Sequence, residues 1–69
     1  MRISARTQLQ GTVTHVEPGA VTTAVKVELR GGDVVTSSIT KEAADELGIA
    51  VGTHITVLIK ASDVILAVD

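Results

Sequence analysis

The core of this chain has to be built without a single aromatic side chain. Its 69 residues include no Phe, Trp or Tyr and no cysteine, so the apolar positions are filled almost entirely by Val, Ile, Leu and Ala. β-Branched side chains of this kind favour strands over helices. The composition therefore predicts a small, mostly β fold that contains no disulfide bonds.

The short length also predicts association between subunits. A chain of this size buries only about 60% of its unfolded surface, so a monomer is marginally stable. Disulfides are excluded, and the two histidines, His15 and His54, are too few and too isolated for a dedicated zinc site. We therefore expect a homo-oligomer, and no metal held directly by protein side chains.

The charge balance argues against large anionic partners. Six Lys and Arg stand against eight Asp and Glu, a formal net charge of −2, so no basic field attracts nucleic acid or acidic membranes. The aromatic platforms on which single-stranded nucleic acid stacks are also missing. No leader pattern is present, and no apolar run approaches the ~20 residues of a membrane span. We expect a cytoplasmic protein that binds neither nucleic acid nor membrane.

Alternation of apolar and polar residues predicts the strands. It is clearest over residues 21–30, where Val21, Val25, Val27 and Leu29 share one face. Turns are predicted at residues 17–19, which contain a Pro-Gly pair, and at the paired glycines of residues 30–33. Further strands are predicted at residues 9–16, 34–39, 54–60 and 64–68. Gly11, inside the first of these, indicates a bulge or a close approach of another backbone.

One short helix interrupts the strands. Residues 41–47 favour a helix, with Thr40 as its N-cap and Gly48 in the left-handed position after its end. The order of three strands, a helix and two strands is that of a five-stranded oligonucleotide/oligosaccharide-binding (OB-type) barrel. An SH3-like small barrel is the alternative. Without repeats or linkers, residues 1–69 are interpreted as one domain.

Catalytic signatures are weak. The sequence has no Gly-rich phosphate loop, no nucleophilic cysteine and no recognisable Ser–His–Asp spacing, so we expect no enzymatic activity. His15 and His54 fall within predicted strands and are interpreted as ordinary surface or packed histidines.

Two stretches near the chain ends have the chemistry of an anion site. Ser4 and Arg6 are two residues apart, so both project from one side of an extended segment and offer a hydroxyl and a guanidinium. A solvated charge near the terminus is the alternative for Arg6. Lys60 is followed by the small residues Ala61 and Ser62, whose backbone N–H groups an anion can approach; Ser62 is alternatively a turn cap.

The start of the predicted helix is the third candidate. Unpaired N–H groups and the helix dipole favour anions at a helix N-terminus. Thr40 therefore caps the helix, contacts a ligand, or does both, and capping is the simpler interpretation.

These stretches together resemble one known family. The motifs are Ser4-Ala5-Arg6-Thr7-Gln8, Gly11, Ile39-Thr40-Lys41-Glu42 before a helix ending at Leu47-Gly48, and Lys60-Ala61-Ser62-Asp63-Val64. In order and spacing, over essentially the whole chain, they resemble the molbindin (Mop) family. These are small cytoplasmic molybdate-binding proteins whose TOBE/Mop-type domain also occurs in molybdate-responsive regulators and transporter ATPases.

The resemblance implies a function and a set of ligands. It implies non-catalytic binding of molybdate or tungstate, without an organic cofactor, at subunit interfaces of a hexamer that is a trimer of dimers. The implied role is intracellular molybdenum storage, and an oxyanion-sensing subunit that acts on a partner protein is the alternative. The implied oxyanion-binding positions are Ser4, Arg6, Lys60, Ala61 with the adjacent Ser62, and Thr40 from a neighbouring subunit.

Two departures and a second site complete the comparison with the family. Thr7 stands where the family commonly has Asn, and Ala43 where a Ser is frequent, so that any contact at position 43 has to come from the backbone. The loop Gly19-Ala20-Val21-Thr22 resembles the one that serves a second oxyanion site between subunits. A plain turn leading into the next strand is its alternative interpretation.

Overall fold

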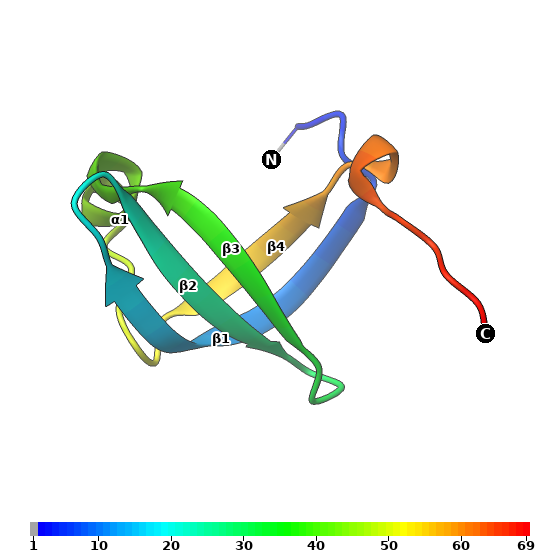
Figure 1. The fold of residues 1–69 in the computed structure, drawn as a ribbon, viewed down its shortest axis with the longest axis horizontal. Helices are drawn as coiled ribbons and strands as arrows, with labels where there is room; N and C mark the ends of the chain where they lie inside the picture. Colours follow the sequence, from blue (N-terminus) through cyan, green and yellow to red (C-terminus); the bar gives the residue numbers. More distant parts are fainter. Residues whose placement is uncertain (1) are drawn as a thin grey trace.

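The computed structural model describes residues 2–69 (Figure 1). This part of the chain is mostly β, with one short helix, as the sequence predicts. Its elements are, in order, β1 (Thr7–Pro18), β2 (Thr22–Leu29), β3 (Val34–Thr40), α1 (Lys41–Leu47), β4 (His54–Ile59) and the 3₁₀ turn η1 (Ala61–Asp63).

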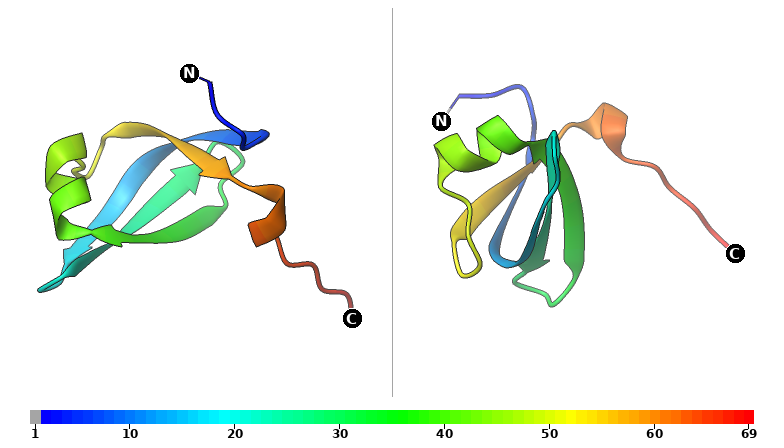
Figure 2. Two further views of the ribbon diagram at one scale, coloured as in Figure 1. Left: turned by 90° about the horizontal axis from the view of Figure 1, so that it is seen from above. Right: turned by 60° about the vertical axis from the view of Figure 1, so that its left-hand side comes forward.

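The four strands form one antiparallel sheet in the order β3-β2-β1-β4. The long strand β1 organises it: its first half pairs with β4, from Thr7 opposite Ile59, and its second half pairs with β2, as far as Pro18 opposite Thr23. Because β1 serves two partners along its length, the sheet curls into a half-barrel (Figure 2). The edge strands β3 and β4 thus border its open side, and α1 lies at one end of it (Figure 1).

The alternating strands build a small core. Val13, Val25 and Val27 are almost completely buried. They point into the curl from β1 and β2 because residues two apart share one face of a strand. Partly buried residues pack around them: Val16, Leu29, Val35, Ile39, Ile49, Ile55 and Val57. The same face of β3 and β4 is therefore apolar but incompletely covered.

Gly11 marks a close approach between β1 and β2. A Cβ atom at this position would lie 2.6 Å from Cγ1 of Val27 and 2.8 Å from the carbonyl oxygen of Glu28. This confirms the close approach predicted for this glycine. The bulge lies elsewhere in β1, where the register with β2 shifts between Val13 and His15.

Helix α1 and its flanking residues agree with the prediction. The Thr40 side chain accepts a hydrogen bond from the Ala43 N–H at 3.0 Å, and Gly48 has a φ of 64°, the left-handed conformation. The glycine turn before β3 is also present, closed by the Gly32 N–H donating to the Leu29 carbonyl at 2.9 Å.

The predicted turn at residues 17–19 is shifted. Pro18 belongs to β1, since the last pair of the ladder joins it to Thr23, and proline is tolerated at a strand end. The turn itself follows, with the Gly19 N–H donating to the Thr22 carbonyl at 2.7 Å. The predicted strand at residues 54–60 ends one residue early, at Ile59, because Lys60 is the N-cap of η1.

The predicted fifth strand is wrong for the single chain. Residues 64–69 have no regular secondary structure, and in Figure 1 they run from η1 away from the sheet to the C-terminus. A β-strand requires a neighbour with which to exchange backbone hydrogen bonds. The bonds of η1 direct the chain away from β4, so residues 64–68 reach no neighbouring strand, and a four-stranded half-barrel replaces the predicted five-stranded barrel.

Candidate functional site

The β1–β4 ladder brings the two predicted cations together. Thr7 pairs with Ile59 at the end of this ladder. Arg6 directly precedes Thr7 and Lys60 directly follows Ile59, so the two residues lie side by side just beyond the last pair. Both side chains are exposed. No carboxylate of residues 2–69 lies within ion-pair distance of either cation. Like charges at neighbouring positions of a sheet repel, so this end of the half-barrel favours an anion.

The turn η1 adds backbone donors to this end. Its two hydrogen bonds are donated by the N–H groups of Asp63 and Val64, whereas the first N–H groups of a short helical turn have no partner inside it. Those belong to Ala61 and Ser62, whose side chains are small and exposed. Lys60 holds the N-cap position of η1 without a side-chain cap bond, so Ser62 lies within the turn and is not its cap.

Ser4 lies at the same end of the molecule. It forms a bend in the exposed segment that precedes β1, and this segment passes beside the end of β4 in Figures 1 and 2. Five of the predicted ligands therefore gather where β1 starts and β4 ends: Ser4, Arg6, Lys60, Ala61 and Ser62. They offer two positive charges, hydroxyl groups and backbone N–H groups, which suits a small oxyanion.

Thr40 lies at the other end of the half-barrel. It pairs with Thr22 at the end of the β2–β3 ladder, and the Lys41 N–H donates to the Val21 carbonyl at 2.9 Å. Thr40 is thus beside the loop of residues 19–22 and separated from Arg6 by the length of β1. The single chain does not unite all the predicted ligands.

The hydroxyl group of Thr40 can both cap and bind. Its oxygen accepts from the Ala43 N–H, and a hydroxyl retains one O–H donor when it accepts. Capping and ligand contact are therefore compatible. The same bond occupies the Ala43 N–H, which makes this amide a poor substitute for the missing serine hydroxyl.

The loop of residues 19–22 offers little beyond its backbone. All four residues are exposed, and the Gly19 N–H is already used in the turn. Thr22 contributes the only hydroxyl group of the loop, at the start of β2.

The other position that departs from the family, Thr7, is the first residue of β1. It pairs with Ile59 and is exposed. Its backbone is thus part of the ladder that brings Arg6 and Lys60 together, one residue away from the charges themselves.

A polar hollow on β1, β2 and β4 was not predicted. It encloses about 350 Å³ and is lined by Gln10, Gly11, Thr12, Glu28, Leu29, Arg30 and His54. It contains one arginine and one glutamate, whose charges offset each other. An anion is therefore attracted less strongly to this hollow than to Arg6 and Lys60. Sequence alone gave no signal for it, because its residues come from three separate strands.

The two histidines have local partners. Nδ1 of His54 lies 3.3 Å from Oγ1 of Thr12, and Nε2 of His15 lies 3.9 Å from Oε2 of Glu17. Both lie in strands, as predicted. Within residues 2–69, no three acidic, His or Cys side chains gather in a way that could hold a metal ion. None of the helices described there is long and apolar enough to cross a membrane.

Comparison with known proteins identifies the family of this chain. Residues 3–66 match the TOBE domain family. The chain is 47% identical over 66 residues to molybdenum-pterin-binding protein 3 of Clostridium pasteurianum, which covers 96% of this chain and 97% of that protein.

Two solved structures share the fold. MopII from Clostridium pasteurianum, in an apo form, superimposes with a TM-score of 0.91 at 39% identity, over 97% of this chain and 100% of that one. The cytoplasmic molybdate-binding protein ModG, with molybdate bound, gives a TM-score of 0.95 at 49% identity, and the chain spans 49% of its length. This chain therefore belongs to the TOBE domain family and, within it, to the Mop-type molybdenum-pterin-binding proteins.

Proposed function

We propose that this chain is a non-catalytic binding protein for molybdate or tungstate that stores molybdenum in the cytoplasm, with residues 1–69 acting as one domain. The observation that carries the proposal is the position of Arg6 and Lys60, which directly precede Thr7 and follow Ile59, the last pair of the β1–β4 ladder. Neither cation has a carboxylate partner among residues 2–69, and the N–H groups of η1 lie beside them. The similarity to ModG, a cytoplasmic molybdate-binding protein, supports molybdate as the ligand.

The chemistry of molybdate fits this set of donors. Molybdate is a tetrahedral dianion whose four oxygens accept hydrogen bonds and donate none. Arg6 and Lys60 supply two positive charges, and Ser4 with the amides of Ala61 and Ser62 supplies neutral donors. Charge-assisted hydrogen bonds are short and strong. The groups present can bind, orient and neutralise the ion, and the proposed role needs no chemical step.

The proposed site is completed by a neighbouring subunit. Thr40 and the paired cations lie at opposite ends of one chain (Figure 1), so a single chain cannot place its own Thr40 against an ion held by Arg6. In a homo-oligomer, the Thr40 end of one subunit meets the cationic end of another. We assign this arrangement to a hexamer, a trimer of dimers, with the oxyanion at its interfaces.

A second oxyanion site is proposed at the loop of residues 19–22. Ala20, Val21 and Thr22 would contribute backbone N–H groups there, while the Gly19 N–H stays in its turn bond. The loop lies next to Thr40. An interface formed at this end of the molecule therefore brings both Thr40 and the loop of residues 19–22 close to another subunit.

Calorimetric titration tests the proposal directly. The full-length protein is titrated with molybdate in buffer that already contains a large excess of sulfate, a smaller oxyanion of equal charge. Tight, saturable heat is expected, with a stoichiometry per chain that reveals sites shared between subunits. Absence of heat from a folded, oligomeric sample would contradict the proposal and favour the interaction-subunit alternative.

Variants of Thr40 separate capping from binding. Thr40→Ala removes the hydroxyl and is expected to lower the free energy of unfolding by about 0.5–2 kcal/mol, the usual cost of losing an N-cap. Thr40→Asp keeps a good cap, so stability should change little, but its negative charge opposes an anion. Denaturant unfolding and molybdate titration of both variants provide the measurement. Unchanged molybdate affinity in Thr40→Asp would show that Thr40 is only a cap.

A further inference from the structure

Charge is distributed unevenly between the two ends of the half-barrel. Residues 2–6 and 60–63, at the end where β1 starts and β4 ends, carry three cations and one carboxylate: Arg2, Arg6, Lys60 and Asp63. Helix α1, at the other end, carries one cation and three carboxylates: Lys41, Glu42, Asp45 and Glu46. All eight residues are exposed. The first group has a formal charge of +2 and the helix a formal charge of −2, so the two ends are electrostatically complementary.

Neither group is neutralised within the chain. Among residues 2–69, the one ion pair joins His15 to Glu17. Asp63 therefore lies beyond ion-pair distance of both Arg6 and Lys60. Two cations enclosed in a subunit interface without a counter-ion destabilise it, because each loses contact with water and the two repel each other. A ligand-free assembly that buries these cations needs an anion beside them.

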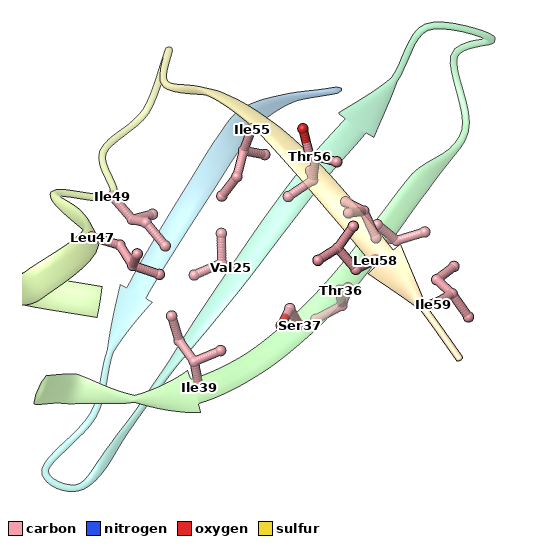
Figure 3. Close-up of a pocket in the computed structure, with 13 residues that line it drawn as sticks. Val25, Thr36, Ser37, Ile39, Leu47, Ile49, Ile55, Thr56, Leu58 and Ile59 are labelled. Carbon is pink, nitrogen blue, oxygen red and sulfur yellow. The ribbon is translucent and has the colours of Figure 1, made fainter. Parts of the chain in front are cut away.

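Helix α1 directs one of its carboxylates away from its own subunit. Ala44 is buried, and Leu47 points from the end of the helix toward the apolar pocket of the half-barrel (Figure 3). These two residues mark the inner face of α1. Successive residues of an α-helix are about 100° apart around its axis, so Glu42, two residues before Ala44, lies on nearly the opposite side and faces outward.

Glu42 is also the carboxylate of α1 that lies nearest to Thr40. It belongs to the first turn of the helix, which Thr40 caps. Asp45 and Glu46 follow about 4.5 and 6 Å further along the axis, at the usual rise of 1.5 Å per residue. An interface that presents Thr40 to another subunit therefore presents Glu42 as well.

We infer that Glu42 of one subunit is the counter-ion of Arg6 and Lys60 of its neighbour when no oxyanion is bound. This inference rests on the proposed function, in which Thr40 of one subunit meets these cations of another. The two oxygens of a carboxylate can accept hydrogen bonds from a guanidinium and an ammonium at the same time. Glu42 then occupies the place that the oxyanion takes.

Oxyanion binding is thereby an exchange of one anion for another. A dianion and the carboxylate of Glu42 repel each other when both face the same two cations, so the side chain leaves as the ion enters. Its position on the exposed face of α1 allows it to return to water. Glu42 thus stabilises the ligand-free interface and lowers the affinity for the oxyanion.

Carbodiimide cross-linking tests the contact without any ligand. This reagent joins a carboxylate to an adjacent amine as an amide and adds no spacer atoms. The wild-type protein is treated in a chloride buffer free of oxyanions, and the linked peptides are identified by mass spectrometry. An amide between Glu42 and Lys60 is expected in a cross-linked dimer, because these residues lie at opposite ends of one chain. Saturating molybdate should suppress it.

The pattern of links decides the assignment. Lys60 that links only to Asp63 of its own chain, or to Glu46 as often as to Glu42, would show that Glu42 is not the counter-ion. A link between Glu42 and Lys60 that persists undiminished in protein saturated with molybdate would show that no exchange takes place.

Two charge-neutralising variants measure the effect on affinity. Glu42→Gln keeps the size of the side chain and removes its charge. Molybdate is expected to bind this variant about ten-fold more tightly than wild type, a factor at the lower end of those for close charge pairs across interfaces. Glu46→Gln removes the same charge one turn further along α1 and should leave the affinity unchanged. Calorimetry at protein concentrations that keep both variants assembled provides the measurement. Unchanged affinity in Glu42→Gln, or equal gains in the two variants, contradicts the exchange.

The two experiments also separate this inference from the proposed function. If wild-type protein binds molybdate and no link between Glu42 and Lys60 forms, the counter-ion is wrong and the proposed function stands. If wild-type protein binds no molybdate, the proposed function and the exchange fail together. The cross-link in chloride buffer still decides in that case whether Glu42 pairs with the cations.

Discussion

Replacing Arg6 or Lys60 with alanine is expected to weaken molybdate binding about ten-fold or more in each case. A hydrogen bond to a charged group contributes roughly 1.5–3 kcal/mol, and 1.4 kcal/mol corresponds to a factor of ten in the dissociation constant. Loss of both cations should approach a hundred-fold effect or exceed it. Arg6→Lys should be intermediate, because the charge is kept while the two-pronged guanidinium is lost. Titration calorimetry in excess sulfate measures all four variants.

Matched substitutions control for the loss of charge. Arg30→Ala removes a guanidinium from the turn before β3, and Lys26→Ala removes an ammonium from β2; both residues are exposed and lie outside the proposed site. Each control changes the net charge by the same amount as its counterpart. If the controls weaken binding as much as Arg6→Ala and Lys60→Ala, the general charge of the protein is responsible and the assignment is wrong.

Local signals in the sequence predicted much of the secondary structure. The alternation around Val25 and Val27 identified β2, and both residues are buried as that pattern requires. Thr40 and Gly48 fixed the ends of α1 because an N-cap hydroxyl and a left-handed glycine act within a few residues of their own position. Gly11 was recognised as a point of close approach for the same kind of reason, the absence of a side chain.

The errors concern pairings between distant residues. β1 extends to Thr7 and Pro18 because β4 and β2 continue beside it, and its own alternation does not encode that length. The segment of residues 64–68 was predicted as a strand from an apolar pattern that is real. A segment with this pattern becomes a strand only where the edge of another strand lies beside it. The single chain places no such edge beside residues 64–68.

The candidate site was predicted in composition but not in layout. Arg6 and Lys60 belong together because Thr7 pairs with Ile59, a register that residues so far apart in sequence do not reveal by themselves. The resemblance to the Mop family grouped Thr40 with them, whereas the structure places Thr40 at the far end of the half-barrel. Thr40 and the two cations can share one site only if they come from different subunits. The resemblance to the Mop family implies this arrangement.

Molybdate is expected to raise the thermal midpoint of the assembled protein by about 10–20 °C. A ligand at one hundred times its dissociation constant, bound only by the native form, stabilises a one-site protein by about 2.7 kcal/mol. For a domain of this size, 1 kcal/mol corresponds to roughly 4–8 °C. Differential scanning fluorimetry needs an environment-sensitive dye here, since the chain has no tryptophan; scanning calorimetry gives the same midpoint without one.

The size of this shift in a weakened variant links stabilisation to the proposed site. At the same molybdate concentration, a ten-fold weaker Arg6→Ala is only ten-fold above its dissociation constant, and the stabilisation falls to about half. Sulfate at that concentration should shift neither protein appreciably. If Arg6→Ala keeps the full shift, or if sulfate reproduces it, the stabilisation does not arise from a selective oxyanion site built on Arg6. Because the proposed site is shared between subunits, the proposal also predicts that the molybdate-dependent midpoint rises with protein concentration.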